Sequence, residues 1–409
     1  MQTRSKSWIK FILILSTIFV ISCSEKTEDD QEIETLVAGV KNEFAPDKRI
    51  AIFDIDFEKK DGAFEIKGET NIPEAKNRLL EKLKARNIKY SESISVLPDS
   101  SVAGEQYGVI SNSVANLRGE GKHSAELVTQ ATLGTPVKIW KRTKEWLYVQ
   151  TPDGYLAWVD HGGITAMTRE EFDMWKSSAK VIYTNTYGQS YKEASIESKP
   201  VSDLVIGAIL ELEAENSDFF KVRYPDGRPA FISKNEAAVY SDWLSQMETG
   251  QAELVTTAEN LMGLPYLWGG TSSKGVDCSG FTKTVFFMNG MILPRDASQQ
   301  IREGKLVDSI GQFEKLEVGD LLFFGRPATD STSEKVVHVG MWIGNNEFIH
   351  ASGDVHISSM DTASENFDEF NKNRYLRTKR MLGQNSKGLT YLSEKDIYMV
   401  SNSKDTISN

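Results

Sequence analysis

Three side chains in the last third of the chain have the types and spacing needed for covalent catalysis. Cys278 stands in the polar, glycine-flanked segment Asp277-Cys278-Ser279-Gly280, and His338 and His350 interrupt two apolar stretches. Cys278 lies at the start of a predicted helix, where unpaired N–H groups and the helix dipole favour an anion. We therefore expect the thiol pKa to fall and the thiolate to act as a nucleophile with an imidazole nearby.

Each of these residues also has a structural explanation. A free cysteine is often a small buried apolar residue, although the polar setting of Cys278 argues against that role. A single histidine in an apolar strand is usually a hydrogen-bonded core residue, because burial of an unpartnered imidazole is costly. Two such histidines on neighbouring strands, His338 and His350, favour a site.

The spacing of the histidines sets a geometric condition. If Gly344-Asn345-Asn346 form a three-residue hairpin loop, Ile343 pairs with Glu347, and His338 and His350 share one face. A two-residue loop would put them on opposite faces, so the hypothesis requires an odd loop or a bulge. On that condition His338 is the predicted general base, and His350 holds its second ring nitrogen.

The other cysteine, Cys23, ends a leader-like segment. Residues 1–22 combine three basic residues with an apolar run and no acidic residue, which is typical of a signal peptide and too short for a permanent span. The Ser-Cys end resembles a bacterial lipoprotein cleavage box, so Cys23 is predicted to carry lipid. Ser24 in place of aspartate favours outer-membrane delivery of an extracytoplasmic lipoprotein. Cys278 then has no partner for a disulfide, which favours a reactive role.

Composition describes an ordinary multidomain protein. The 409 residues are 40% hydrophobic and 26% charged, with a formal net charge of −11. This length indicates three or four domains. The acidic balance does not favour nucleic acid or an anionic membrane surface as a partner.

The predicted fold class is a multidomain α+β protein. After the leader, the predicted segments are a tether (23–31), an αββαβ accessory domain of unknown role (32–100), two small β-barrels (108–162 and 180–240) that resemble bacterial SH3-like domains, an α+β catalytic domain (248–384) and a polar tail (385–409). The barrels are inferred from an internal repeat, in which Pro152-Asp153-Gly154 recurs as Pro225-Asp226-Gly227. At the same offset Glu126 corresponds to Lys199, and Tyr155 to Arg228.

The C-terminal motifs resemble those of the NlpC family of papain-like cell-wall cysteine peptidases. The motifs are Tyr266-x-Trp268-Gly269-Gly270, Asp277-Cys278-Ser279-Gly280-Phe281, Leu293-Pro294-Arg295, Val318-Gly319-Asp320-Leu321 and the two strand histidines. The resemblance implies a Cys278–His338–His350 triad. It also implies that Tyr266 and the Cys278 N–H polarise the attacked carbonyl, and that Ser279 contacts substrate. Trp268 is predicted to be a core aromatic residue.

Two SH3-like barrels before such a domain look like the γ-D-glutamyl-L-diamino-acid endopeptidases (dipeptidyl-peptidase VI) within that family. This likeness implies that acidic groups capture the free amine of an N-terminal L-alanine, and Asp277 and Glu126 fit that role. Tyr155 or Trp158 would line the same pocket. A substrate-binding hydroxyl is expected two residues after Arg295, where Ala297 stands, and Ser298 is the available substitute.

The predicted reaction is hydrolysis of the bond between γ-D-glutamate and meso-diaminopimelate or L-lysine, which releases L-Ala-γ-D-Glu through a thioester. The substrates would be murein peptides with a free N-terminal L-Ala; no cofactor, metal, nucleic acid or protein partner is implied. One alternative is a peptidoglycan-binding lipoprotein with an inert papain-like domain. A second keeps Cys278 but acts on an ester or acyl chain.

Overall fold

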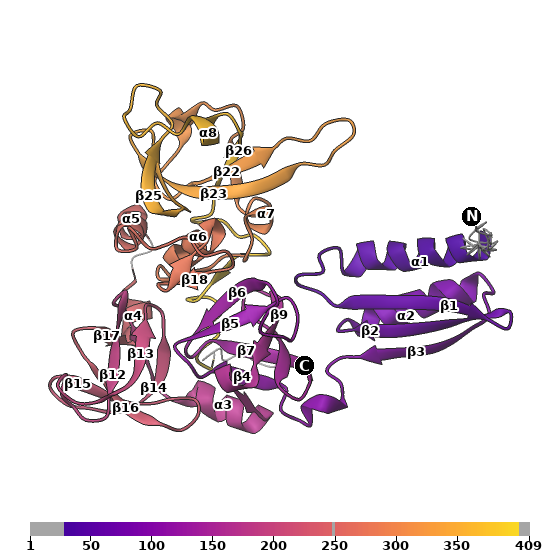
Figure 1. Ribbon diagram of the computed structural model, residues 1–409, viewed down its shortest axis with the longest axis horizontal. Coiled ribbons are helices and arrows are strands. Elements are labelled where there is room, and N and C mark those ends of the chain that lie inside the picture. Colours follow the sequence, from indigo (N-terminus) through magenta and orange to yellow (C-terminus); the bar gives the residue numbers. More distant parts are fainter. Residues whose placement is uncertain (1–27, 248–249, 401–409) are drawn as a thin grey trace, which may run out of the picture.

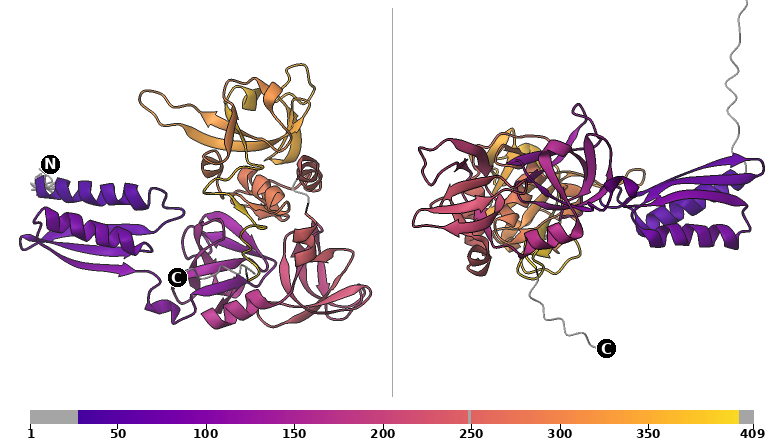
Figure 2. Two further views of the ribbon diagram at one scale, coloured as in Figure 1. Left: turned by 180° about the vertical axis from the view of Figure 1, so that it is seen from behind. Right: turned by 90° about the horizontal axis from the view of Figure 1, so that it is seen from below.

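The computed structural model describes residues 28–247 and 250–400 and divides them into four units. The N-terminal unit extends from the other three, which pack together as two barrels and a catalytic domain (Figure 1; Figure 2 shows the same arrangement from behind and from below). Within the described residues, no helix has both the length and the apolar character needed to cross a membrane.

The N-terminal unit is a three-stranded sheet with two helices. Its elements are α1 (Glu28–Phe44), β1 (Phe53–Lys60), β2 (Ala63–Thr70), α2 (Pro73–Ala85) and β3 (Tyr90–Val96). Strand β2 is antiparallel to β1 and parallel to β3. Pro73 begins α2, where its missing N–H has no helical partner to lose. The αββαβ order agrees with the sequence, but α1 already begins at Glu28, inside the predicted tether.

The first barrel has seven strands in the order β10-β4-β7-β8-β9-β5-β6. They are β4 (Tyr107–Ile110), β5 (Val114–Arg118), β6 (Leu127–Thr132), β7 (Pro136–Arg142), β8 (Trp146–Gln150), β9 (Leu156–Asp160) and β10 (Ile164–Met167). The helix α3 (Arg169–Ser177) follows, with a capping box formed by Thr168 and Glu171.

The second barrel repeats this sheet strand for strand. Its strands are β11 (Lys180–Tyr183), β12 (Tyr187–Tyr191), β13 (Pro200–Val205), β14 (Ile209–Glu215), β15 (Phe219–Arg223), β16 (Pro229–Ser233) and β17 (Ala237–Val239), and α4 (Tyr240–Ser245) follows. Each of these strands begins 73 positions after its counterpart. The repeat predicted from the sequence is confirmed, including the shared turn in which Gly154 and Gly227 both have positive φ.

The C-terminal domain packs helices against a six-stranded sheet of order β21-β26-β22-β23-β24-β25. The strands are β21 (Lys305–Asp308), β22 (Leu321–Arg326), β23 (Lys335–Gly344), β24 (Glu347–Ser352), β25 (Asp354–Ser359) and β26 (Tyr375–Arg380). The helices are α5 (Gln251–Glu259), α6 (Cys278–Phe287), α7 (Ala297–Gln300) and α8 (Glu369–Lys372). Phe281 and Val285 of α6 are fully buried against this sheet.

Two short antiparallel pairs complete the domain. They are β18 (Thr271–Ser272) with β19 (Gly275–Val276), and β20 (Met291–Ile292) with β27 (Thr390–Tyr391). The second pair shows that the segment predicted as a polar tail is folded as far as residue 400. Leu392 and Tyr398 are buried in a cluster with residues of both barrels, because the apolar side chains of this segment fill the junction between units.

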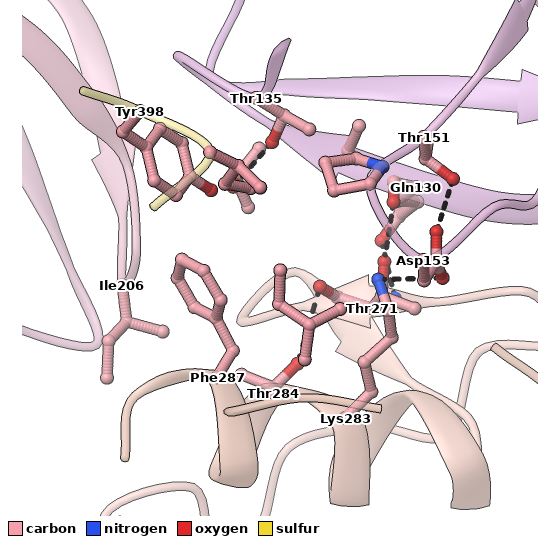
Figure 3. A pocket seen from close by; sticks show the side chains of 15 residues that line it. Gln130, Thr135, Thr151, Asp153, Ile206, Thr271, Lys283, Thr284, Phe287 and Tyr398 are labelled. Atoms are coloured by element: carbon pink, nitrogen blue, oxygen red, sulfur yellow. Dashed lines mark hydrogen bonds and ion pairs between the residues drawn. The ribbon is translucent and has the colours of Figure 1, made fainter. Parts of the chain in front are cut away.

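A cavity lies where the first barrel meets α6 (Figure 3). Lys283 of α6 reaches Asp153 of the first barrel at 3.1 Å, and the Asp153 side chain is almost completely buried. Gln130 of β6 lies beside Thr271 at the same junction. Polar contacts between largely buried groups therefore fix the first barrel relative to α6, the helix that begins at Cys278.

Candidate active site

The nucleophile candidate Cys278 is the first residue of α6. The Asp277 carboxylate accepts a hydrogen bond from the Gly280 N–H at 2.7 Å and so caps this helix. The backbone N–H groups of Val339 and Ser279 interact with the sulfur. Only 7% of Cys278 is exposed.

The thiol is nevertheless protonated in the free cleft. Burial, followed by the negative charge of Asp277, raises the pKa of the Cys278 thiol to about 12. The neighbouring N–H groups oppose this rise without overcoming it. The predicted fall of the thiol pKa is therefore wrong for the free cleft, because burial outweighs the helix terminus.

The two histidines reach the same face by a bulge. The turn is Asn345-Asn346, both in the left-handed region, with Gly344 paired to Glu347. A two-residue loop alone would separate the histidines, but the register shifts between Trp342 and Gly344. Beyond the bulge, Met341 pairs with Ile349. This is the register required by the sequence argument, reached by its bulge alternative and not by the three-residue loop.

The histidines form a hydrogen-bonded chain that ends at a serine. His338 Nε2 lies 2.7 Å from His350 Nδ1, and His350 Nε2 lies 3.1 Å from Ser358 Oγ. If His338 keeps its proton on Nε2 and donates to His350, its Nδ1 lone pair is left to accept a proton. Ser358, on β25, was not predicted as a site residue.

Both imidazoles are neutral in this environment. Burial, followed by the charge of His350, holds the pKa of His338 well below its usual range. Burial and then His356 lower the pKa of His350 to about 3. His356 pairs directly across from His350, with ring centroids 4.5 Å apart. Its Nδ1 lies 2.9 Å from Asp354 Oδ1.

Asp277 forms a buried ion pair with Arg295. The guanidinium reaches both carboxylate oxygens, with Nη2 2.6 Å from Oδ2 and Nη1 3.0 Å from Oδ1. Asp277 also accepts from the N–H groups of Gly269 and Gly280 and from Ser279 Oγ. These contacts use the acceptor capacity of the carboxylate, so Asp277 fixes the loop around the nucleophile.

A cleft of about 510 Å³ opens beside Cys278. Its lining brings together most of the predicted site residues with others that were not predicted, namely Arg49, Glu126, Val128, Tyr155, Tyr266, Trp268, Gly269, Asp277, Cys278, Ser279, Asp296, Ala297, Ser298, Lys335, Val336 and Val337. The first barrel supplies Glu126 and Tyr155, and the N-terminal unit supplies Arg49. The cleft is therefore built from three of the four units.

Tyr266 presents a protonated hydroxyl to this cleft. Burial, followed by the charges of Cys278 and Asp277, raises the pKa of Tyr266. Its hydroxyl has no hydrogen-bond partner among the described residues, so its hydrogen is left for a ligand.

The structure decides between the two aromatic candidates for the cleft and contradicts the prediction for Trp268. Trp158 lies outside the cleft, where its ring packs at 4.9 Å from that of Tyr148 and lines a different depression. Trp268 is 64% exposed and is not a core residue. Its indole Nε1 donates to Glu126 Oε1 at 2.7 Å, which connects the catalytic domain to the first barrel across the cleft. Tyr155 is thus the predicted aromatic residue that lines the cleft.

Tyr155 and Asp296 form a second contact between those units. The Tyr155 hydroxyl lies 3.2 Å from Asp296 Oδ2. Burial, followed by the Asp296 charge, raises the pKa of Tyr155, so this hydroxyl also stays a donor. Asp296 was not predicted; the only sequence signal was its place after Arg295 in the motif segment.

Comparisons with known proteins match this architecture. The profile of the NlpC/P60 family matches residues 263–374, and that of the bacterial dipeptidyl-peptidase SH3 domain matches residues 117–164. A Bacillus cereus protein named gamma-D-glutamyl-L-lysine dipeptidyl-peptidase is 32% identical over 240 residues, 55% of this chain and 67% of that protein. Dipeptidyl-peptidase 6 of Lysinibacillus sphaericus is 28% identical over 267 residues, 61% of this chain and 89% of that protein.

A solved structure shares most of the fold. The crystal structure of an NlpC/P60 family protein from Bacillus cereus superposes with a TM-score of 0.58 and 26% identity. It covers 68% of this chain and 99% of the solved chain.

Proposed function

Because the chain belongs to the NlpC/P60 family of cysteine peptidases, we propose that it hydrolyses the bond between γ-D-glutamate and the following diamino acid of murein peptides. The diamino acid would be L-lysine or meso-diaminopimelate. The observation that supports this function best is the shared cleft, which is lined by Cys278 and by Glu126 and Tyr155 of the first barrel.

The first half of the reaction forms a thioester. The Cys278 proton moves to His338 Nδ1 as the sulfur attacks the γ-carbonyl carbon, and the carbonyl electron pair moves to oxygen. The Cys278 N–H and the Tyr266 hydroxyl would donate to that oxygen. Collapse of the tetrahedral intermediate breaks the C–N bond, and the leaving amine takes its proton from His338.

The second half of the reaction hydrolyses the thioester and regenerates the free enzyme. Water gives a proton to His338 as its oxygen attacks the thioester carbon, and collapse breaks the C–S bond. The sulfur recovers the proton from His338, and L-Ala-γ-D-Glu leaves. The His350–Ser358 chain holds the His338 ring through its Nε2, which leaves Nδ1 as the basic nitrogen throughout.

Selectivity for a free N-terminal amine is assigned to Glu126. This exposed side chain receives one hydrogen bond, from Trp268, and keeps Oε2 without a partner among the described residues. An ammonium group beside that carboxylate would form a charge-assisted hydrogen bond. Since Asp277 is paired with Arg295, its proposed contribution is the position of the loop around Cys278.

The test is hydrolysis of L-Ala-γ-D-Glu-L-Lys and of its diaminopimelate counterpart, each compared with the N-acetylated peptide. The expected result is cleavage of the free-amine peptides alone, with no activity in Cys278→Ala. Equal cleavage of free and acetylated peptides would remove the amine selectivity. An inactive wild-type protein that still sediments with murein would instead favour the wall-binding alternative.

Lipid attachment at Cys23 is also part of the proposal, although Cys23 lies outside the described residues. The basis is the leader pattern of residues 1–22, and the proposed location is extracytoplasmic at the outer membrane. Labelling of wild-type protein with a fatty-acid analogue in a bacterial host, and its loss in Cys23→Ser, would test this assignment.

A further inference from the structure

Arg49 belongs to the N-terminal unit but lies in the wall of the active-site cleft. It stands in the loop between α1 and β1. Its Nη1 donates to Asp296 Oδ2 at 2.7 Å and to Ser298 Oγ at 2.9 Å. Both partners line the cleft beside Cys278. The N-terminal unit, for which the sequence suggested no role, thus reaches the candidate active site.

The guanidinium is held in one orientation by a neighbouring carboxylate. Asp47 accepts from Arg49 Nε at 2.8 Å and from Nη2 at 2.6 Å, and it also accepts from Gln299 Nε2 at 3.0 Å. Burial raises the pKa of Asp47, but these hydrogen bonds outweigh it and lower the value to about 2. Asp47 therefore stays charged at neutral pH and keeps Arg49 against α7.

The loop that carries Arg49 is docked on the first barrel. The Leu156 N–H donates to the Arg49 carbonyl at 2.7 Å, and Gln150 Nε2 donates to the Ile50 carbonyl at 2.9 Å. Behind the loop, Ile52 is buried in an apolar cluster with Trp140 of the barrel. The position of Arg49 is therefore set by packing and by backbone hydrogen bonds.

Donors remain on this part of the cleft wall. Of the five guanidinium N–H groups, the four described contacts leave one on Nη2. Ser298 Oγ accepts from Arg49, so its own hydrogen is left for another acceptor. Lys335 lines the same cleft and has no ion pair within the described residues. A ligand group that satisfies these donors must be an acceptor, and a carboxylate suits them best.

We propose that Arg49 and Ser298 bind the free α-carboxylate of the γ-linked glutamate, so that the N-terminal unit supplies a specificity residue. The proposal rests on the proposed function, in which a γ-peptide bond leaves that carboxylate free and negative. The two carboxylates of Asp47 and Asp296 more than offset the single charge of the guanidinium. Recognition is therefore attributed to the directed N–H and O–H donors and not to net charge.

The experiment compares two peptides that differ only at this group. They are L-Ala-γ-D-Glu-L-Lys and the same peptide with the α-carboxylate converted to a carboxamide. Wild-type protein is expected to prefer the acid in kcat/KM by about 10-fold or more, the scale of one or two hydrogen bonds to a charged group. Arg49→Ala should lose most of that preference by losing activity on the acid, with the amide little changed. Ser298→Ala should lose a smaller part.

Two control variants separate this role from domain docking. Arg86→Ala removes a cation of the same unit whose partner is Glu32, far from the cleft. Lys141→Ala removes the ion pair with Glu69 that joins the barrel to the N-terminal unit without touching the cleft. Both should keep the acid preference. If Arg49→Ala lowers activity on the two peptides equally, Arg49 is only structural and the proposal fails.

Binding measured without catalysis distinguishes failure of this proposal from failure of the proposed function. Calorimetry of both peptides with Cys278→Ala protein, with and without Arg49→Ala, reports the carboxylate preference directly. If the wild-type protein cleaves neither peptide but the Cys278→Ala protein prefers the acid through Arg49, the carboxylate site is retained and the peptidase function is rejected. If the wild-type protein cleaves the peptides but the Cys278→Ala protein binds both with equal affinity, the peptidase function is retained and the carboxylate site is rejected.

Discussion

Both barrels contact the β18–β19 hairpin of the catalytic domain from the same strand position, but the contacts differ in chemistry. Gln130 of β6 and Asp203 of β13 are counterparts in the repeat. Gln130 is 6% exposed, and its Oε1 accepts from the Thr271 N–H at 3.1 Å and from Ser272 Oγ at 2.9 Å. Asp203 instead forms an ion pair with Lys274 at 2.7 Å, between partly exposed side chains.

The difference between the barrels extends to the cleft. Glu126 and Tyr155 of the first copy line it, whereas their counterparts Lys199 and Arg228 are exposed on the second copy. The duplicated fold thus gave one copy an edge that lines the cleft, whereas the other copy contacts the catalytic domain away from it. Similar backbones do not imply similar roles, because a role depends on which edge faces the cleft.

The largest expected effect comes from giving the first barrel the residue of the second. Glu126→Lys should lower kcat/KM for L-Ala-γ-D-Glu-L-Lys by about 100-fold, or roughly 3 kcal/mol, because a carboxylate–ammonium attraction becomes a repulsion. The N-acetylated peptide should stay uncleaved by both the wild type and the variant. Steady-state kinetics on both peptides measure it.

The matched exchange in the second barrel is Lys199→Glu. It should leave kcat/KM unchanged within about two-fold, because Lys199 lies outside the cleft. Similar losses from both exchanges would mean that charge on either barrel acts at long range, and the proposed division of roles would be wrong.

The hairpin contacts give the next largest difference. Gln130→Ala leaves the Thr271 N–H and the Ser272 hydroxyl without their partner at a buried position, at a cost of about 2 kcal/mol. Asp203→Ala removes a partly exposed ion pair and should cost less than about 1 kcal/mol. Hydrogen–deuterium exchange of residues 270–277 measures both, and comparable deprotection would contradict the distinction between them.

Tyr155→Phe tests the smaller effect of a single hydroxyl. Loss of its hydrogen bond to Asp296 should lower kcat/KM by about five-fold, or roughly 1 kcal/mol, mostly through KM. Arg228→Ala, at the equivalent position of the second barrel, should have no effect on the kinetics. A fall in kcat alone for Tyr155→Phe would show that the hydroxyl acts on the chemical step and not on binding.

The sequence was sufficient for features that depend on periodicity. The repeat was predictable because glycines such as Gly154 and Gly227 occupy the same turn, and its strands keep one offset throughout. His338 and His350 were predictable because each is a polar residue in an apolar strand. The bulge at Trp342–Gly344 was left as an alternative, since loop length and bulge produce the same register.

Features formed between units had no local signal. Arg49 lies 247 positions from Asp296, and Trp268 lies 142 positions from Glu126, so no spacing rule connects them. The thiol pKa was predicted in the wrong direction because a helix start can be read from sequence, whereas the burial around Cys278 cannot. For the same reason the polar composition of the tail did not indicate that Leu392 and Tyr398 are buried at the junction between units.

The smallest expected effect is a pH dependence that only the second barrel should show. Burial raises the pKa of Asp203, but the hydrogen bonds from Lys274 and Ser113 and the Lys274 charge outweigh it, so the pKa is lowered overall. A lowered folded-state pKa means that the stabilisation is complete above the unfolded value of about 4 and is lost as pH falls through the folded value. Gln130 does not titrate.

The difference in unfolding temperature between wild type and Asp203→Asn should therefore be constant from pH 7 to about pH 5 and shrink as pH falls further through the lowered pKa of Asp203. The difference between wild type and Gln130→Ala should persist over that range. Because the Asp203–Lys274 pair is partly exposed, the effect should stay below about 1 kcal/mol and shrink in added salt. An Asp203→Asn difference that does not shrink on acidification would show that the side chain stabilises the hairpin through hydrogen bonds that need no charge.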